Sequence, residues 1–358
     1  MSGEADFDSR IVFYDPVCPV PYSKASLDRG GLGGSEACVV RVAEALDACV
    51  VQHCRDTPEG RYRPPFSAPN VEHVVVLRDA RALPEARRRF PNARPHVWLH
   101  DLAAPGSTRA KWLTKVDASL RGATLVCVSD FLHARVAAVV DGLSSAEHVK
   151  VRTIFNSIDD DLAPSEAPID ANRLIFLSSP NKGLGYALAS FQALREAMPE
   201  LQLYVANPGY RELAANEIPG VSWLGKLPHA QAMSCVRSSL AVYMPNLLLP
   251  ETFGLVYAEA NAVGTPVLAH DVGAAREVLH PANPVLPVRV RQRVGARVAR
   301  ELGGHASRWL SGVAQRCGLF DDYIETIRAW RSGQRPQVRG DSRFRHSAVI
   351  REWRQLLA

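Results

Sequence analysis

Long apolar runs are missing from this 358-residue chain, although 47% of its residues are hydrophobic. No stretch approaches the roughly 20 uninterrupted apolar residues that cross a bilayer. The first residues, MSGEADFDSR, lack the basic and apolar regions of a signal peptide, so we expect a cytoplasmic protein. With 22% charged residues the composition is globular rather than disordered, and the length predicts two domains.

Paired cysteines are missing as well. The seven cysteines are scattered and none forms a CxxC pair, which excludes a zinc ribbon and a thioredoxin-type centre. Several stand inside apolar runs, as in TLVCVS, where a free cysteine serves as a small hydrophobic residue. We therefore expect reduced thiols.

Neither sign of charge dominates, because 42 Lys and Arg stand against 37 Asp and Glu. A net charge of +5 is compatible with phosphorylated small molecules, anionic membranes or nucleic acid. Arginines gather in 281–300, PANPVLPVRVRQRVGARVAR, a segment that offers no aromatic side chain for base stacking. A nucleic-acid surface, a patch facing anionic lipid and plain solvated charge are the alternatives; solvated charge is favoured, and no nucleic-acid partner is expected.

Short apolar runs alternate with longer amphipathic segments along the chain, which is typical of a parallel sheet covered by helices on both faces. In the first half, strands are predicted at 11–15, 50–54, 73–78, 96–100, 124–129 and 149–155, and helices at 35–48, 80–90, 107–120 and 130–140. A proline-containing loop around Pro164 and Pro168 then reads as a linker.

The alternation restarts after this linker. Strands are predicted at 173–178, 201–207, 221–225, 240–245 and 266–270, and helices at 183–198, 228–238, 254–263 and 273–279. We predict an α/β protein with two doubly wound Rossmann-like domains, 1–163 and 164–340, and an amphipathic helix at about 341–358. Because ligands of such sheets bind beyond the carboxyl ends of the strands, we expect the site in a cleft between the domains.

A glycine-rich loop, GGLGGSE at 30–36, follows the first predicted strand. Its glycines allow close approach of a ligand, Ser35 suits an N-cap, and the first helical amides form an anion site for which a pyrophosphate is the expected occupant. Neither the GxGxxG fingerprint nor GxxxxGK[ST] is present. A glycine turn with only a structural role is an equal alternative.

Two carboxylates flank the start of a predicted helix in PETFGLVYAEA at 250–260. Glu251 precedes the helix and Glu259 lies in its second turn, where they could hold sugar hydroxyls while backbone amides hold phosphate. Alternatively, Glu251 caps the helix and Glu259 is a solvated helix charge.

Two further side chains follow predicted strands. Lys182 stands at a helix N-terminus, where a cation opposes the helix dipole unless an anion is shared; a lysine extended into solvent is the alternative. His100 ends the strand HVWLH, so it can point into the ligand crevice, although a structural histidine is the commoner case.

These residues together closely resemble glycosyltransferase family 4, the retaining, nucleotide-sugar-dependent enzymes of GT-B architecture. The resemblance covers nearly the whole chain, in the family's order. It consists of GGLGGSE, His100, VCVSDFLHARV with KVRTIFNSIDDDLAP, Lys182-Gly183, ETFGLVYAEANAVGTPVLA and the terminal FRHSAVIREWRQLLA. It implies that the terminal helix crosses back to the first domain.

The resemblance also implies roles for matched positions. Glu251 would hold the donor sugar's hydroxyls, Glu259 would bind the nucleotide ribose, and His100 would contact the donor sugar near the reacting carbon. Lys182 would neutralise the pyrophosphate. The remaining donor-binding positions would act through their backbone and are Gly33, Gly34, Phe253, Gly254 and Leu255.

A retaining transfer from a UDP- or GDP-linked sugar to a glycan, lipid-linked or small-molecule acceptor is therefore expected, with no metal or cofactor and with possible peripheral membrane contact. One position departs from the family pattern: where the family usually carries an arginine shortly before the lysine, this chain has Ser178 and Ser179. A lysine with two hydroxyls grips a diphosphate less firmly than an arginine with a lysine. A non-catalytic partner protein of the same fold is accordingly the alternative.

Overall fold

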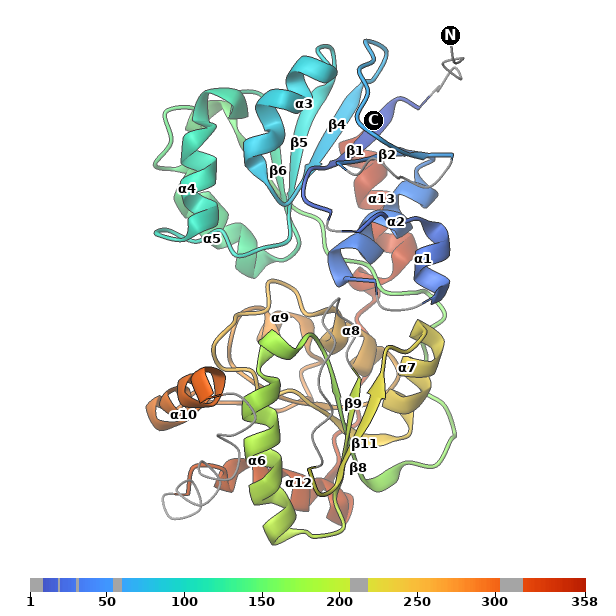
Figure 1. Ribbon diagram of the computed structural model, residues 1–358, viewed down its shortest axis with the longest axis vertical. Coiled ribbons are helices and arrows are strands. Elements are labelled where there is room, and N and C mark those ends of the chain that lie inside the picture. The colour runs from blue at the N-terminus through green and yellow to red at the C-terminus, as the bar shows by residue number, and fades with distance from the viewer. Residues whose placement is uncertain (1–8, 19, 30–31, 54–59, 207–217, 303–317) are drawn as a thin grey trace. The chain divides into compact units, whose positions relative to one another are not determined.

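The computed structural model describes residues 9–18, 20–29, 32–53, 60–206, 218–302 and 318–358. The chain forms two compact units (Figure 1). The first comprises the described residues up to Ser26, Gly34–Ser157 and His346–Ala358, and the second Ile158–Arg345 with the described residues of Leu27–Gly33. The predicted domain boundary follows residue 163, and the boundary between the two units in the structure follows Ser157. Gly30 and Gly31 of the glycine-rich loop lie outside the described residues.

The first unit is built on a seven-stranded parallel sheet of order β3-β2-β1-β4-β5-β6-β7. Its register pairs Val12 of β1 with Cys49 on one side and with Val74 on the other. The strands are β1 (Ile11–Asp15), β2 (Cys49–Gln52), β3 (Tyr62–Arg63), β4 (His73–Leu77), β5 (Arg94–Leu99), β6 (Thr124–Cys127) and β7 (Lys150–Thr153). Six of these agree with predicted strands to within a few residues; the two-residue β3 was not predicted.

Helices flank this sheet: α1 (Lys24–Arg29), α2 (Gly34–Ala45), α3 (Leu83–Arg89), α4 (Thr108–Lys115), α5 (Asp130–Val140) and α13 (His346–Leu356). Serine caps fix two of their starts, because Ser107 Oγ accepts from the Ala110 amide at 3.1 Å and Ser129 Oγ from the Leu132 amide at 3.0 Å. The helix predicted at 107–120 is shorter, since α4 ends at Lys115 and a separate 3-10 turn covers Asp117–Leu120. The short α1 was not predicted.

The second unit has a six-stranded parallel sheet of order β10-β9-β8-β11-β12-β13. Its strands are β8 (Asp170–Leu177), β9 (Gln202–Ala206), β10 (Val221–Gly225), β11 (Ser239–Tyr243), β12 (Val267–His270) and β13 (Val285–Leu286). The strand β8 begins three residues earlier than predicted, because the Asp170 amide donates to the carbonyl of Ser238 at 2.9 Å. The edge strand β13 was not predicted.

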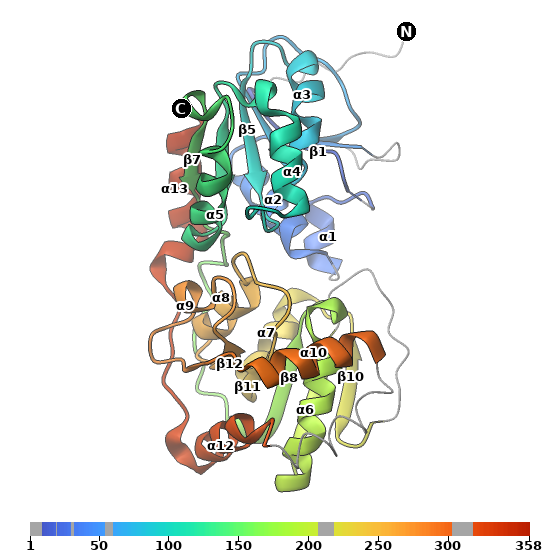
Figure 2. The ribbon, with the colours of Figure 1, turned by 90° about the vertical axis from the view of Figure 1, so that its left-hand side faces the viewer.

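The helices of the second unit are α6 (Leu184–Ala197), α7 (His229–Arg237), α8 (Leu255–Ala262), α9 (Ala275–Val278), α10 (Val290–Leu302) and α12 (Asp321–Ala329). The arginine-rich segment 281–300 therefore contains β13 and most of α10, which packs on α6 (Figure 2). Within the described residues, no helix combines the length and apolar character needed to cross a bilayer.

Candidate active site

In both sheets the strand order reverses at one defined point. In the first unit the chain runs from β1 outward through β2 and β3 and then resumes at β4, on the other side of β1. In the second unit it runs from β8 through β9 and β10 and resumes at β11, beside β8. The carboxyl ends of such strand pairs, where the order reverses, are where ligands bind in doubly wound sheets.

At the reversal point of the second sheet, the structure joins two predicted site residues. Lys182 ends the short 3-10 helix Pro180–Lys182 that follows β8, and Glu251 lies in the segment that follows β11. The Lys182 Nζ lies 2.7 Å from Oε2 of Glu251. The lysine side chain is 40% exposed and that of Glu251 only 6%. A buried carboxylate thus meets a cation that can still reach solvent.

Backbone geometry fixes this pair. Gly183, at φ +101°, is left-handed, and a Cβ there would lie 3.7 Å from Cα of Asn246. The Asn246 side chain shapes the segment before Glu251, because its Oδ1 accepts from the amides of Leu248 and Leu249 at 3.3 and 3.2 Å. The loops after β8 and β11 are therefore in contact, which brings the lysine to the carboxylate.

The second carboxylate oxygen of Glu251, Oε1, has no donor among the described residues. Within the described part of the chain, no group hydrogen-bonds Oε1, although this atom is buried. A buried carboxylate oxygen without a donor is costly, and it is suited to accept from a ligand hydroxyl. The N-cap of α8 is Gly254, at φ +90°, and Glu251 directs its Oε2 to Lys182 instead of to the start of the helix. The alternative that Glu251 caps the helix is therefore wrong.

Glu259 is also buried, with 7% of its surface exposed, so the alternative of a solvated helix charge is wrong. Its Oε1 lies 2.8 Å from Nε2 of His229, the first residue of α7. Nδ1 of the same ring lies 3.4 Å from a carboxylate oxygen of Asp159. His229 therefore bridges two carboxylates. Its partnership with Glu259 was not predicted, since the two residues stand thirty positions apart.

The predicted backbone positions sit at two helix starts. Phe253 is buried with its ring 5.0 Å from that of Phe344, which fixes the turn into α8 at Gly254 and Leu255. Gly34 is the first residue of α2, directly after Gly33. The roles of these positions in binding a donor remain predictions.

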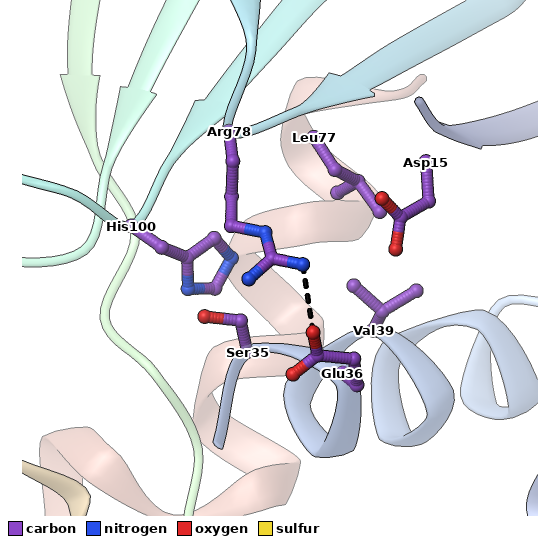
Figure 3. A pocket seen from close by; sticks show the side chains of 7 residues that line it. All are labelled: Asp15, Ser35, Glu36, Val39, Leu77, Arg78 and His100. Atoms are coloured by element: carbon purple, nitrogen blue, oxygen red, sulfur yellow. Dashed lines mark hydrogen bonds and ion pairs between the residues drawn. The ribbon is translucent and has the colours of Figure 1, made fainter. Parts of the chain in front are cut away.

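The reversal point of the first sheet forms a small hollow (Figure 3). Asp15 ends β1, Arg78 follows β4, His100 follows β5, and Ser35 and Glu36 open α2. Figure 3 shows the guanidinium of Arg78 pointing at Glu36, and the two groups lie 2.7 Å apart. Sequence reasoning identified His100 here and missed the pairing of Arg78 with Glu36. The signal it overlooked is that Arg78 is the last residue of a predicted strand.

Burial sets the charges in this hollow. It raises the pKa of Asp15 above its usual value, opposed by Arg78 and by the Tyr22 hydroxyl, which donates to Oδ2 at 2.8 Å. Burial also lowers the pKa of His100 to about 3, with a further contribution from Arg78. The His100 imidazole is thus neutral at physiological pH, so it can bind a hydroxyl but is no proton source there.

The sequence profile described as Glycosyl transferases group 1 matches residues 171–296, which contain Lys182, Glu251 and Glu259. Over this segment, about a third of the chain, the protein is similar to the group 1 glycosyl transferases. This match supports the family resemblance inferred from the motifs.

Curated proteins with similar segments include two mannosyltransferases. A phosphatidyl-myo-inositol mannosyltransferase of Mycobacterium leprae is 33% identical over 104 residues, covering 28% of each chain. A GDP-mannose-dependent monoacylated alpha-(1-6)-phosphatidylinositol monomannoside mannosyltransferase of Corynebacterium glutamicum is 30% identical over 113 residues, covering 29% of this chain and 30% of the relative. The matched segments thus span less than a third of these relatives.

Solved structures show the fold over nearly the full length. Anabaena Alr3699/HepE in complex with UDP-glucose aligns with a TM-score of 0.60 and 18% identity, covering 97% of this chain and 98% of that one. Sucrose-phosphate synthase from Thermosynechococcus elongatus also gives 0.60, with 16% identity and the same coverage. The prediction of two Rossmann-like domains of GT-B type is confirmed.

Proposed function

We propose that this protein is a glycosyltransferase that moves a sugar from a nucleoside-diphosphate donor to an acceptor hydroxyl. The observation that carries the proposal is the Lys182–Glu251 ion pair at the reversal point of the second sheet. The pair offers a cation for a diphosphate and a buried carboxylate for sugar hydroxyls within 2.7 Å of each other. The match of residues 171–296 to the profile of group 1 glycosyl transferases supports the same activity.

The pair suggests how the donor is received. The ammonium group of Lys182 can swing from Glu251 to the diphosphate, because its side chain is partly in solvent. This exchange leaves both carboxylate oxygens of Glu251 available to sugar hydroxyls. One of these oxygens, Oε1, already lacks a donor within the described residues. Glu259 would bind the ribose, and the neutral imidazole of His100 would accept or donate a hydrogen bond to the donor sugar.

In the proposed reaction, the bond between the anomeric carbon and the diphosphate oxygen breaks while the acceptor oxygen bonds to the same carbon from the same face. The acceptor proton passes to the departing diphosphate, so charge and atoms balance. Lys182 stabilises the negative charge that develops on the leaving group, and the reaction would need no divalent metal. The anomeric configuration is then retained.

Two donor classes and three acceptor classes are candidates. The Corynebacterium relative is named for GDP-mannose, and the Anabaena structure contains UDP-glucose. Both curated relatives are named for phosphatidylinositol-type acceptors, which places a lipid-linked acceptor beside glycans and small molecules.

The test is turnover with GDP-mannose and with UDP-glucose, offered with phosphatidylinositol in detergent and with simple glycosides. Release of GDP or UDP and the anomeric configuration of the product are measured, with and without a chelator. We expect Lys182→Met and Glu251→Gln each to lower kcat/KM at least about 100-fold, the effect of removing one preorganised charge partner. Matched changes at exposed Lys226 and Glu325 leave it unchanged.

Each unexpected outcome has a defined meaning. Equal activity of all four variants would remove Lys182 and Glu251 from the site. Inversion of configuration, or loss of turnover with the chelator, would contradict the retaining, metal-free chemistry. Thermal stabilisation by GDP or UDP without turnover on any acceptor would favour the non-catalytic alternative.

A further inference from the structure

One face of helix α10 is buried against the rest of the second unit. Gln292, Ala296 and Ala299 are buried, with 0, 3 and 1% of their surfaces exposed. Helix α10 packs on α6, whose Gly185 approaches so closely that a Cβ there would be 3.2 Å from the carbonyl oxygen of Ala299, and the Gln292 side-chain amide donates to the carbonyl of Leu319 at 3.3 Å. Figure 2 shows α10 lying along the outside of the second unit, over α6. The helix is thus held by its inner face, and its outer face is turned away from the core.

The α10 outer face consists of Val290, Arg293, Val294 and Arg297. The helical repeat of 3.6 residues places these four on one side, opposite the buried residues. Val290 is 81% and Val294 54% exposed, and both arginines are exposed. Both valines therefore leave apolar surface exposed to water next to two arginines, and this exposed area does not stabilise the fold.

Charge complementarity identifies what this face fits. Helix α10 contains four arginines and a single acidic residue, Glu301 in its last turn, so the sequence of the helix carries a net positive charge. Guanidinium groups bind phosphates, and short aliphatic side chains between them can enter the boundary between lipid headgroups and acyl chains. A nucleic acid would use the arginines but would leave the valines exposed, and the α10 outer face has no aromatic ring for stacking.

We propose that the α10 outer face docks onto an anionic lipid surface. The arginines contact lipid phosphates, and Val290 and Val294 insert between the headgroups. This attachment uses the C-terminal unit alone and is independent of the proposed transfer reaction. If the chain acts on a lipid-linked acceptor, α10 would hold it at the surface where that acceptor resides.

The experiment is flotation of the full-length protein, without donor, with vesicles of phosphatidylcholine or of an equal mixture of phosphatidylcholine and phosphatidylglycerol. We expect binding to the mixed vesicles at low salt and weak binding to phosphatidylcholine alone. Each arginine at an anionic surface strengthens binding about fivefold, so Arg293→Gln with Arg297→Gln should weaken it about 25-fold. Val290→Ser with Val294→Ser keeps the charge and should weaken it roughly tenfold.

The matched control is Arg328→Gln with Arg351→Gln, two exposed helical arginines on α12 and α13, which removes the same charge. It should retain wild-type binding, and all variants should keep the wild-type unfolding temperature because only exposed positions change. The proposal is overturned if the wild type binds neither vesicle, or if the control pair weakens binding as much as the α10 pair. It is also overturned if the serine variant binds as the wild type does while a DNA duplex competes with the vesicles, since α10 would then be a nucleic-acid surface. Turnover plays no part in these measurements, so they can fail while the transferase proposal stands.

Discussion

Buried histidines of the first unit couple its stability to pH. Nδ1 of His73 on β4 lies 3.1 Å from Nε2 of His96 on β5, with the rings stacked, and both are almost fully buried. Burial lowers the pKa of His73, and it lowers the pKa of His96 to about 3, with His73 and Arg94 adding to the effect. His100, with its pKa also near 3, directly follows the same strand.

The sign of the pH effect follows. Because the folded protein keeps these rings neutral while the unfolded chain protonates them below about pH 6.5, their contribution to stability is complete above that pH. It is lost progressively as the pH falls toward 3, with unfolding free energy decreasing by up to about 1.4 kcal/mol per pH unit for each histidine. Urea unfolding between neutral and mildly acidic pH measures this slope. His96→Gln should make it shallower; an unchanged slope would show that His96 does not titrate with folding.

The residue scale also shows what the sequence could and could not supply. Lys182 and Glu251 were predictable as site residues, because each follows a predicted strand and their family pattern is local. The lack of a hydrogen-bond donor for Oε1 of Glu251 was not predictable, since it depends on which groups the described part of the fold places near this atom. The contacts of His229 with Glu259 and of Arg78 with Glu36 join segments that are distant in sequence. From the sequence alone, each of these charged residues could equally be a solvent-exposed charge, so the pairs could not be predicted.

At the scale of elements, the turn after β12 supports the segment that carries Glu251. The amide of Ala274 donates to the Glu251 carbonyl at 2.9 Å, and Glu251 forms an isolated parallel bridge with Gly273. Gly273 has φ +75°, and a Cβ there would lie 2.3 Å from the Glu251 carbonyl oxygen. Two features therefore require glycine at position 273: the left-handed φ angle and the close approach of the two backbones.

A matched pair of substitutions separates these two demands. Gly225, at the end of β10, has φ +66°, and a Cβ there would have no atom of the described residues within 4 Å. Gly225→Ala should therefore cost only the left-handed strain, about 1 kcal/mol of unfolding free energy. Gly273→Ala should cost at least about 2 kcal/mol more, because the backbone contact must open, and it should lower turnover by displacing Glu251. Equal losses in urea unfolding would contradict the role given to the contact.

Element prediction succeeded where burial and periodicity agreed. The central strands β1, β4, β5 and β6 each contain a run of apolar residues and are buried along nearly their whole length, so their pattern is unambiguous. The two-residue edge strands β3 and β13 are too short to carry a pattern, and pairing with a neighbour alone defines them. Helix α10 was not identified because its prolines lie before it and its arginines obscure a narrow buried stripe of Gln, Gly and Ala.

On the scale of the whole molecule, the chain ends in the unit where it began. Helix α13 belongs to the first unit, as the resemblance implied. In the sequence it comes after the whole of the second unit's main segment, Ile158–Arg345. Trp353 of α13 is fully buried, with its ring 5.7 Å from that of Phe13 and 4.8 Å from that of Trp98. The Trp98 ring in turn lies 4.5 Å from His100. The last helix therefore supports the core beneath a candidate site residue.

Removing the Trp353 side chain should therefore destabilise one unit selectively. Trp353→Ala leaves a large cavity against Phe13 and Trp98 and should lower the unfolding free energy of the first unit by about 3–5 kcal/mol. Hydrogen exchange should then show lost protection in β1 and β5, while β8 and β11 of the second unit keep theirs. Arg351→Ala, on the exposed face of the same helix, should change neither unit. Equal loss of protection in both units would show that they unfold as one cooperative body, because the cavity touches residues of the first unit alone.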